Sequence, residues 1–162
     1  MKPEHILAAA ALMSCISLGT AQAGNRHVHV QATVCFEATC EAARLRIWDG
    51  DTFIIDRPGQ RPLKIRIENI DTPEIEGRCA YETDLAQRSK QRLAALLRTT
   101  IAVHSGRLDR YGRQLATITA GGRDVGDILV SERLARRWDG ARHSWCSGAG
   151  TATTSSNNQA EE

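Results

Sequence analysis

Apolar and charged residues alternate along the first half of this 162-residue chain, and the alternation limits it to a fold built on a sheet. From Leu63 to Ile67 every second residue is apolar and the residues between are charged, which is the period of a half-buried strand. Upstream, residues 44–55 hold a second alternating run and the β-forming segment Phe53–Ile55, and residues 57–60 have the composition of a turn. Residues 44–72 therefore predict three strands, the last ending before Pro73, with Arg66 pointing away from the apolar side.

The second half of the chain predicts two helices and two further strands. Apolar residues recur on one face of a helix from Tyr81 to Arg98. Residues 101–104 and 115–119 predict short strands, and Asp124 is a good N-cap for a short second helix. Three strands, a helix, two strands and a helix fit a mainly β (α+β) fold, a small five-stranded barrel of the oligonucleotide-binding (OB) type with two packed helices.

The N-terminus has the pattern of a secretory signal peptide over residues 1–23. The apolar run Ile6–Leu18 is too short to span a membrane as a stable anchor, and Ala21–Ala23 forms an A-x-A cleavage site. The alternative is a lipoprotein cleavage box at Leu12–Cys15, which is the poorer match. We expect cleavage after Ala23 and a periplasmic or secreted protein without stable membrane insertion, and the sequence does not choose between these two locations.

Behind the signal, the sequence predicts an N-terminal leader at residues 24–43, one domain at 44–146 and a disordered tail at 147–162. The tail has no large apolar residue, so it has nothing to bury in a core. In the leader, His27 and His29 alternate on an extended segment. They can be read as metal ligands, but two such histidines are more typical of plain surface.

Four cysteines remain after Cys15, which lies in the signal: Cys35, Cys40, Cys79 and Cys146. An even number in an exported chain favours disulfides. Four cysteines allow three pairings, and their positions alone do not choose among them. Zinc is the competing use, but the C-x4-C spacing has no second close pair as in a zinc ribbon.

The charge of the chain is small but unevenly distributed. The net charge is +2, whereas residues 44–145 hold 19 Lys and Arg against 14 Asp and Glu. Arginine supplies 18 of the 21 basic residues of the chain, and its guanidinium suits bidentate phosphate contacts. Codon preference and ordinary surface explain most of these arginines. Arg66 and Arg113 stand out because of where they lie.

Three short segments hold the groups needed to cut a phosphodiester bond with a bound cation. Asp51 follows a glycine in the first, and Asp71 and Thr72 end a strand in the second. Two carboxylates and the Thr72 carbonyl would hold Ca²⁺ or Mg²⁺ in an open site that leaves positions for water and substrate. Taken alone, each segment is equally consistent with a turn that carries solvated charges.

The remaining groups of these segments suit the chemistry of hydrolysis. Glu74 lies three residues beyond Asp71 and would orient or deprotonate the attacking water. Arg66, on the preceding strand, and Arg113, in the third segment at 109–113, would neutralise the charge of a pentacoordinate phosphorus.

These segments resemble the staphylococcal nuclease (thermonuclease) family. The similar motifs are D-G-D-T at 49–52, R-x4-D-T-P-E at 66–74 and D-R-Y-G-R-x-L-A at 109–116, and residues 124–135 resemble the second helix of the family. The resemblance covers about 44–137. It implies a five-stranded barrel that cleaves DNA and RNA with Ca²⁺ and leaves 3′-phosphate ends.

The resemblance also implies a role for each matching residue. It implies that Asp51 and Asp71 bind calcium through their carboxylates, that Thr72 binds it through its backbone carbonyl, and that Glu74 is the general base. It also implies that Arg66 and Arg113 stabilise the transition state and that Arg110 and Tyr111 contact a terminal phosphate.

The chain also departs from the family pattern near its C-terminus. In place of the tyrosine pair of the family, which helps line the base pocket, it has Trp138, which we expect to bind substrate. A long third helix has no equivalent after Trp145. We therefore predict a Cys79–Cys146 disulfide that holds down the C-terminal segment, and a Cys35–Cys40 disulfide between two cysteines close in sequence.

The leading hypothesis is an exported nuclease, expected to act as a monomer on DNA and RNA, with single strands preferred. The alternative is a non-catalytic nucleic-acid-binding module on the same barrel, since fold alone does not fix function. A binding module has no need for the carboxylates, Glu74 and both arginines together. A structural or adhesive periplasmic domain would leave all of them unexplained.

Overall fold

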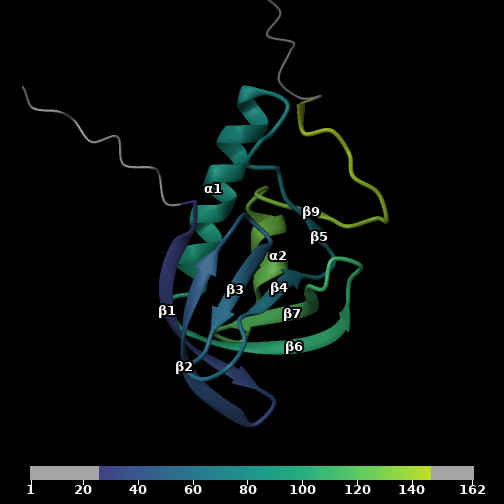
Figure 1. The fold of residues 1–162 in the computed structure, drawn as a ribbon. Coiled ribbons are helices and arrows are strands. Elements are labelled where there is room, and N and C mark those ends of the chain that lie inside the picture. Colours follow the sequence, from purple (N-terminus) through teal and green to yellow (C-terminus); the bar gives the residue numbers. More distant parts are fainter. Residues whose placement is uncertain (1–25, 147–162) are drawn as a thin grey trace, which may run out of the picture.

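A computed structural model of the chain describes residues 26–146, which form a closed barrel of six strands with two helices packed on it (Figure 1). The barrel strands are β1 (Val28–Phe36), β2 (Thr39–Ile47), β3 (Thr52–Asp56), β4 (Leu63–Ile67), β6 (Thr100–Leu108) and β7 (Gln114–Ala120). The short strands are β5 (Ile70–Asp71), β8 (Arg123–Asp124) and β9 (Arg136–Arg137), and the helices are α1 (Ala80–Leu96) and α2 (Val125–Ser131).

The barrel closes through a parallel pairing of two strands that are distant in sequence. Its strand order is β4-β3-β2-β1-β6-β7, and β4 then pairs with β7 from Ile65–Gln114 to Ile67–Ala116. The β1–β6 pairing is also parallel, and the remaining neighbours are antiparallel. The interior is filled by large apolar side chains with no exposed surface, such as Leu45, Phe53 and Ile118. Closure brings Arg66 of β4 beside the start of β7, where the β6–β7 loop ends.

The predicted fold class is confirmed, but the predicted number of strands and the predicted boundary at residue 44 are wrong. Residues 28–36, assigned to a leader, form β1, which pairs with β2 from Val28–Ile47 to Phe36–Thr39. Thus β2 runs straight through the predicted boundary. Val30 and Val34 are buried in the barrel, so their alternation with polar residues is that of a sixth strand.

The helices lie close to where the sequence predicts them. Helix α1 buries its apolar face, including Leu85, Leu93 and Ala94, and contacts β1 and β2. Asp124 caps α2, because its side chain accepts a hydrogen bond of 2.7 Å from the backbone N–H of Asp127. None of the helices within residues 26–146 has the length and apolar character needed to cross a membrane.

The last described residues return to the barrel beside β5. Strand β9 pairs with β5, Ile70 with Arg137 and Asp71 with Arg136. Residues 138–146, here called the C-terminal strap, then run as an irregular segment to the start of α1 (Figure 1). There Cys146 is bonded to Cys79, which confirms one predicted disulfide.

The other predicted disulfide, Cys35–Cys40, is confirmed and joins β1 to β2 near their connecting turn. The predicted signal at residues 1–23 and the predicted tail at 147–162 lie outside the described residues.

Candidate active site

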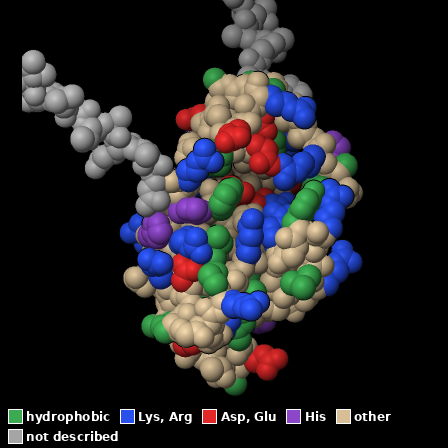
Figure 2. Space-filling view, viewed as in Figure 1, with side chains coloured by type: hydrophobic (Ala, Val, Ile, Leu, Met, Phe, Trp, Pro, Cys, Tyr) green, Lys and Arg blue, Asp and Glu red, His purple; other side chains and the backbone are tan. Residues whose placement is uncertain are grey.

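An open cleft of about 1160 Å³ lies between the end of β4, the loop that joins β6 to β7, and the C-terminal strap. Figure 2 shows Lys and Arg side chains gathered on this face around a hollow. Basic side chains outnumber acidic ones in the lining: Lys64, Arg66, Arg107, Arg110, Arg113 and Arg142 against Glu68, Glu74 and Asp109. Tyr111 and Trp138 also line the cleft. Positive charge with exposed aromatic rings suits an anionic ligand that carries flat groups.

All residues that the sequence predicts for catalysis and substrate binding line this one cleft: Arg66, Glu74, Arg110, Tyr111, Arg113 and Trp138. They come from β4, the segment after β5, the β6–β7 loop and the strap. The predicted metal ligands Asp51, Asp71 and Thr72 are buried, with 2%, 4% and 3% of their surface exposed. Asp51 is hydrogen-bonded to Thr72 and paired with Arg66, and Asp71 lies near Arg142, so the predicted metal ligands lie next to the cleft.

Asp51 joins the β2–β3 turn to the end of β5. Its Oδ2 accepts hydrogen bonds from the Thr72 hydroxyl at 2.8 Å and the Thr72 backbone N–H at 3.2 Å. Its position is fixed by Asp49, whose Oδ1 accepts from the backbone N–H groups of Asp51 and Thr52. Between them, a Cβ on Gly50 would lie 2.1 Å from Ser89 Oγ, so glycine lets this turn approach α1 closely.

Arg66 is buried against the predicted metal ligands. It forms an ion pair with Asp51, and its Nη2 donates to the carbonyl of Ile70 at 3.1 Å. The sequence predicts that Arg66 faces away from the apolar side of β4; in the structure only 8% of its surface is exposed, and Asp51 pairs with its guanidinium. The pair neutralises one buried carboxylate, and the remaining N–H groups of this guanidinium are left for the cleft that Arg66 lines.

Asp71 has one carboxylate oxygen without a hydrogen-bond partner. Its Oδ2 accepts from the indole N–H of Trp145 at 3.3 Å, whereas its buried Oδ1 has none, and Arg142 Nε lies 3.9 Å from Oδ1. Burial raises the pKa of Asp71; the Arg142 charge opposes this shift and the Asp51 charge adds to it. An orphaned carboxylate oxygen beside a second carboxylate is a good ligand for a hard cation.

Asp49 completes an acidic cluster, and the sequence reasoning did not assign it to the site. Burial and the charge of Asp51 raise its pKa to about 7. Of these three carboxylates, Asp51 is paired with Arg66 and Asp71 lies 3.9 Å from Arg142, and the repulsion that remains between Asp49 and Asp51 is one that a divalent cation would relieve. The sequence does carry a signal for Asp49, because the D-G-D-T motif at 49–52 places Asp49 and Asp51 on either side of one glycine.

The residues present therefore fit a hard cation at Asp51 and Asp71, with Asp49 near by. Among residues 26–146, the group of three ligand-type side chains whose ligand atoms lie within 4.8 Å of one another is a different one, Cys79, Glu82 and Cys146. Both of its sulfur atoms are in the disulfide, so they cannot bind metal as thiolates. The acidic cluster is the better candidate metal centre.

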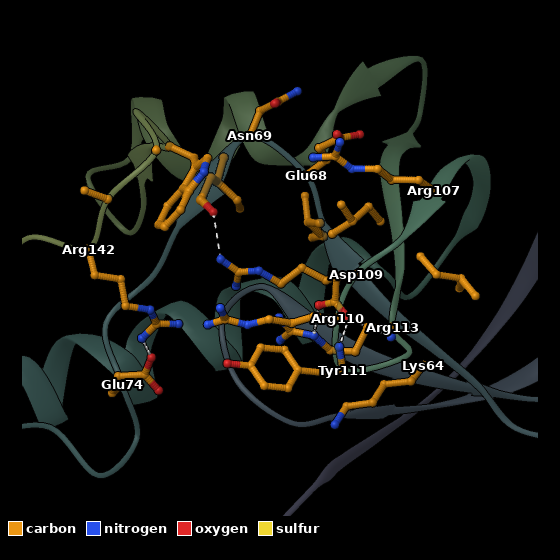
Figure 3. Close-up of a pocket in the computed structure, with 18 residues that line it drawn as sticks. Lys64, Glu68, Asn69, Glu74, Arg107, Asp109, Arg110, Tyr111, Arg113 and Arg142 are labelled. Carbon is orange, nitrogen blue, oxygen red and sulfur yellow. Dashed lines mark hydrogen bonds and ion pairs between the residues drawn. The ribbon is translucent and has the colours of Figure 1, made fainter.

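Glu74 is bound to an arginine that the sequence reasoning missed. Its carboxylate forms an ion pair with Arg142 of the strap, drawn in Figure 3, and both side chains are about half exposed. No motif marks Arg142, one of many arginines in the chain. The contact exists because the strap is folded back over the site.

The β6–β7 loop holds Arg113 in a fixed orientation. Asp109 accepts from the backbone N–H of Tyr111 at 2.8 Å and from the backbone N–H and Nε of Arg113 at 2.9 and 2.7 Å. Partial burial acts against ionisation, but these hydrogen bonds outweigh it and lower the pKa of Asp109. Gly112 makes the turn with a φ of 73°. The outer nitrogens of Arg113 are left for a ligand in the cleft.

A comparison with known protein families agrees with this geometry. The family model described as staphylococcal nuclease homologue matches residues 64–162, more than half of the chain. The matched region contains Arg66, Asp71, Glu74 and Arg113. It begins after β3, so it is the three-dimensional structure that connects Asp49 and Asp51 to these residues through Thr72 and Arg66.

Proposed function

We propose that this chain, which belongs to the staphylococcal nuclease family, is a calcium-dependent nuclease that hydrolyses phosphodiester bonds of DNA and RNA. One observation carries the proposal. Glu74, Arg66 and Arg113 reach a single basic cleft from separate elements, and a buried cluster of carboxylates lies directly behind Arg66. A binding site for a polyanion has no use for that cluster unless it holds a cation.

In the proposed reaction, Glu74 accepts a proton from the water that attacks phosphorus. Arg66 and Arg113 stabilise the negative charge that grows on the equatorial oxygens. The bond from phosphorus to O5′ breaks and O5′ takes a proton from solvent, so the products are a 3′-phosphate and a 5′-hydroxyl. Asp109 contributes by holding Arg113 through Nε.

The proposed cation would be held by Asp51, Asp71 and Thr72, with Asp49 adding negative charge beside them. When bound, it supplies electrostatic stabilisation of the phosphoryl oxygen. Weak extracellular calcium sites have dissociation constants of roughly 10⁻⁴–10⁻³ M, and we expect this range because few carboxylates bind directly.

We also propose that the protein is exported and acts in a periplasm or outside the cell. Two disulfides support this location, because such bonds persist in oxidising compartments and are rare in the cytosol. The substrate we propose is single-stranded, with bases stacked on Tyr111 or Trp138, which are both exposed in the cleft.

Two ion pairs favour the rival function, a non-catalytic nucleic-acid-binding module. Glu74, the proposed base, is paired with Arg142. Arg66, a proposed phosphate ligand, is paired with Asp51. If neither pair opens when substrate enters, the cleft binds nucleic acid without cutting it.

The discriminating experiment is incubation of the purified protein with single-stranded DNA and with RNA, in calcium and in excess chelator. The nuclease proposal predicts short products with 3′-phosphate ends in calcium alone. Retention of intact nucleic acid in calcium would favour the binding module, and full cleavage in chelator would refute the role of the cation.

A further inference from the structure

The C-terminal strap forms one wall of the cleft and is fastened at several points. Its first residue, Trp138, donates a backbone hydrogen bond of 2.9 Å to the carbonyl of Asn69. Near its end the Trp145 indole donates to Asp71, and Cys146 is bonded to Cys79. Arg136 adds a guanidinium 3.6 Å from the centre of the Trp145 ring. The ends of the strap are thus held close to the acidic cluster.

Between these attachments, Arg142 projects from the strap into the cleft. Its guanidinium pairs with Glu74, and its Nε lies 3.9 Å from the orphaned oxygen of Asp71. In Figure 3 Arg142 extends from one side toward Glu74, whereas Arg110, Tyr111 and Arg113 lie on the other side of the opening. A ligand in the cleft would lie between these two sets of side chains.

The Arg142–Glu74 pair is suited to exchange. About half of each side chain is exposed, 54% for Arg142 and 46% for Glu74, and exposed ion pairs contribute little to stability. A phosphodiester offers Arg142 two oxygens in a geometry that matches its guanidinium. Glu74 must be free of the pair before it can accept a proton.

We propose that Arg142 is a substrate-binding residue that pairs with Glu74 in the empty cleft and moves to a backbone phosphate of nucleic acid when the cleft is filled. The strap presents it, and the Cys79–Cys146 disulfide holds the strap in place. The inference rests on the proposed function only in taking nucleic acid as the ligand.

The test is a binding measurement that does not depend on cleavage. Anisotropy of a labelled single-stranded oligothymidylate is recorded in excess chelator over a series of KCl concentrations. Each phosphate contact on a single strand contributes about 0.7 to the slope of log K against log[salt]. Arg142→Ala should lower the slope by about that amount and bind about fivefold more weakly at 0.1 M salt. Arg142→Lys, which keeps the charge, should retain the slope.

Arg88→Ala is the matched control, since it removes one exposed arginine from α1 outside the cleft. It should bind as the parent does. The proposal is overturned if Arg142→Ala keeps the parental slope, or if it binds more tightly, which would mean that Arg142 obstructs the cleft. Equal losses in Arg142→Ala and Arg88→Ala would overturn it too, because they would reflect net charge alone.

A second variant tests the strap. Cys79→Ser/Cys146→Ser should lower the salt slope by the same amount as Arg142→Ala. Adding Arg142→Ala to this double variant should then lower the slope little further. A further drop as large as that of Arg142→Ala alone would overturn the role of the disulfide. Cleavage tests the proposed function separately from the binding slopes that test Arg142. A parent that binds but never cleaves in calcium refutes the nuclease, while the slopes still decide Arg142. A parent that cleaves in calcium but does not bind in chelator overturns the role of Arg142 and leaves the nuclease standing.

Discussion

Asp49 is the residue whose ionisation the acidic cluster alters most clearly. Its folded-state pKa is raised to about 7 from an ordinary value of 3.8, by burial and by the charge of Asp51. The folded state therefore holds this proton more tightly than the unfolded chain does. Its contribution to stability is full below about pH 4 and is lost as pH rises to about 7.

Asp49→Asn should remove this pH-dependent loss of stability, because an amide does not titrate. Its oxygen can still accept from the N–H groups of Asp51 and Thr52, so the turn should be kept. Unfolding by urea in chelator, at pH 5 and pH 8, measures the loss. We expect the free energy of unfolding to fall more between these pH values in the parent than in the variant. An identical fall in both would show that Asp49 does not titrate as described.

Arg66 and Arg113 should be equally important for turnover but unequal for stability. Loss of one charge-stabilising donor lowers turnover about 10²–10³-fold, and we expect this for Arg66→Ala and Arg113→Ala. Arg66→Ala also leaves Asp51 buried without its partner, and breaking a buried pair costs about 3–5 kcal/mol.

Arg113 pairs with Asp109 in a partly buried position, and in Arg113→Ala the Asp109 carboxylate keeps its backbone hydrogen bonds, so the melting temperature should fall less than in Arg66→Ala. Initial rates on single-stranded DNA and thermal melting of each variant decide this, with Arg88→Ala as the control. A folded Arg113→Ala with the parental rate would refute the role of that arginine.

At the scale of elements, the two disulfides should have different consequences. Cys79–Cys146 closes a loop with a sequence separation of 67, for which chain entropy predicts about 4 kcal/mol of stabilisation, whereas Cys35–Cys40, with a separation of 5, should contribute about half as much. Cys79→Ser/Cys146→Ser should also lose activity, since its strap carries Arg142 and Trp145. Cys35→Ser/Cys40→Ser should remain active. Urea unfolding and initial rates of both pairs test this, and equal activity in the two would contradict it.

The sequence predicts the elements whose signals are local. The helix from Tyr81 needs only its apolar period, and the cap at Asp124 needs only its own side chain. Strand β1 also has a local signal, the valines 28, 30 and 34 at even spacing, but the sequence prediction places these residues in a leader. The Glu74–Arg142 and Asp71–Trp145 contacts have no local signal, because the sequence separation is 68 in the first contact and 74 in the second.

At the scale of the whole molecule, closure of the barrel puts two exposed aromatic residues, Tyr111 and Trp138, at one cleft. Stacking of an unpaired base on such a ring is worth about 1–3 kcal/mol, and a stable duplex does not offer its bases in this way. The protein should therefore cleave single strands faster than the same sequence in a stable duplex. Initial rates on the two forms measure this, and equal rates would contradict it.

The role of Glu74 in this cleft is tested most directly by Glu74→Gln. The amide keeps the shape of the side chain but cannot accept the proton of water. The parent and the variant are compared on single-stranded DNA in saturating calcium, with thermal melting as the check on folding. We predict a folded variant whose rate falls by at least 10²-fold, the lower range of general-base effects. A folded, calcium-loaded Glu74→Gln that cuts near the parental rate would contradict the mechanism, even with the fold unchanged.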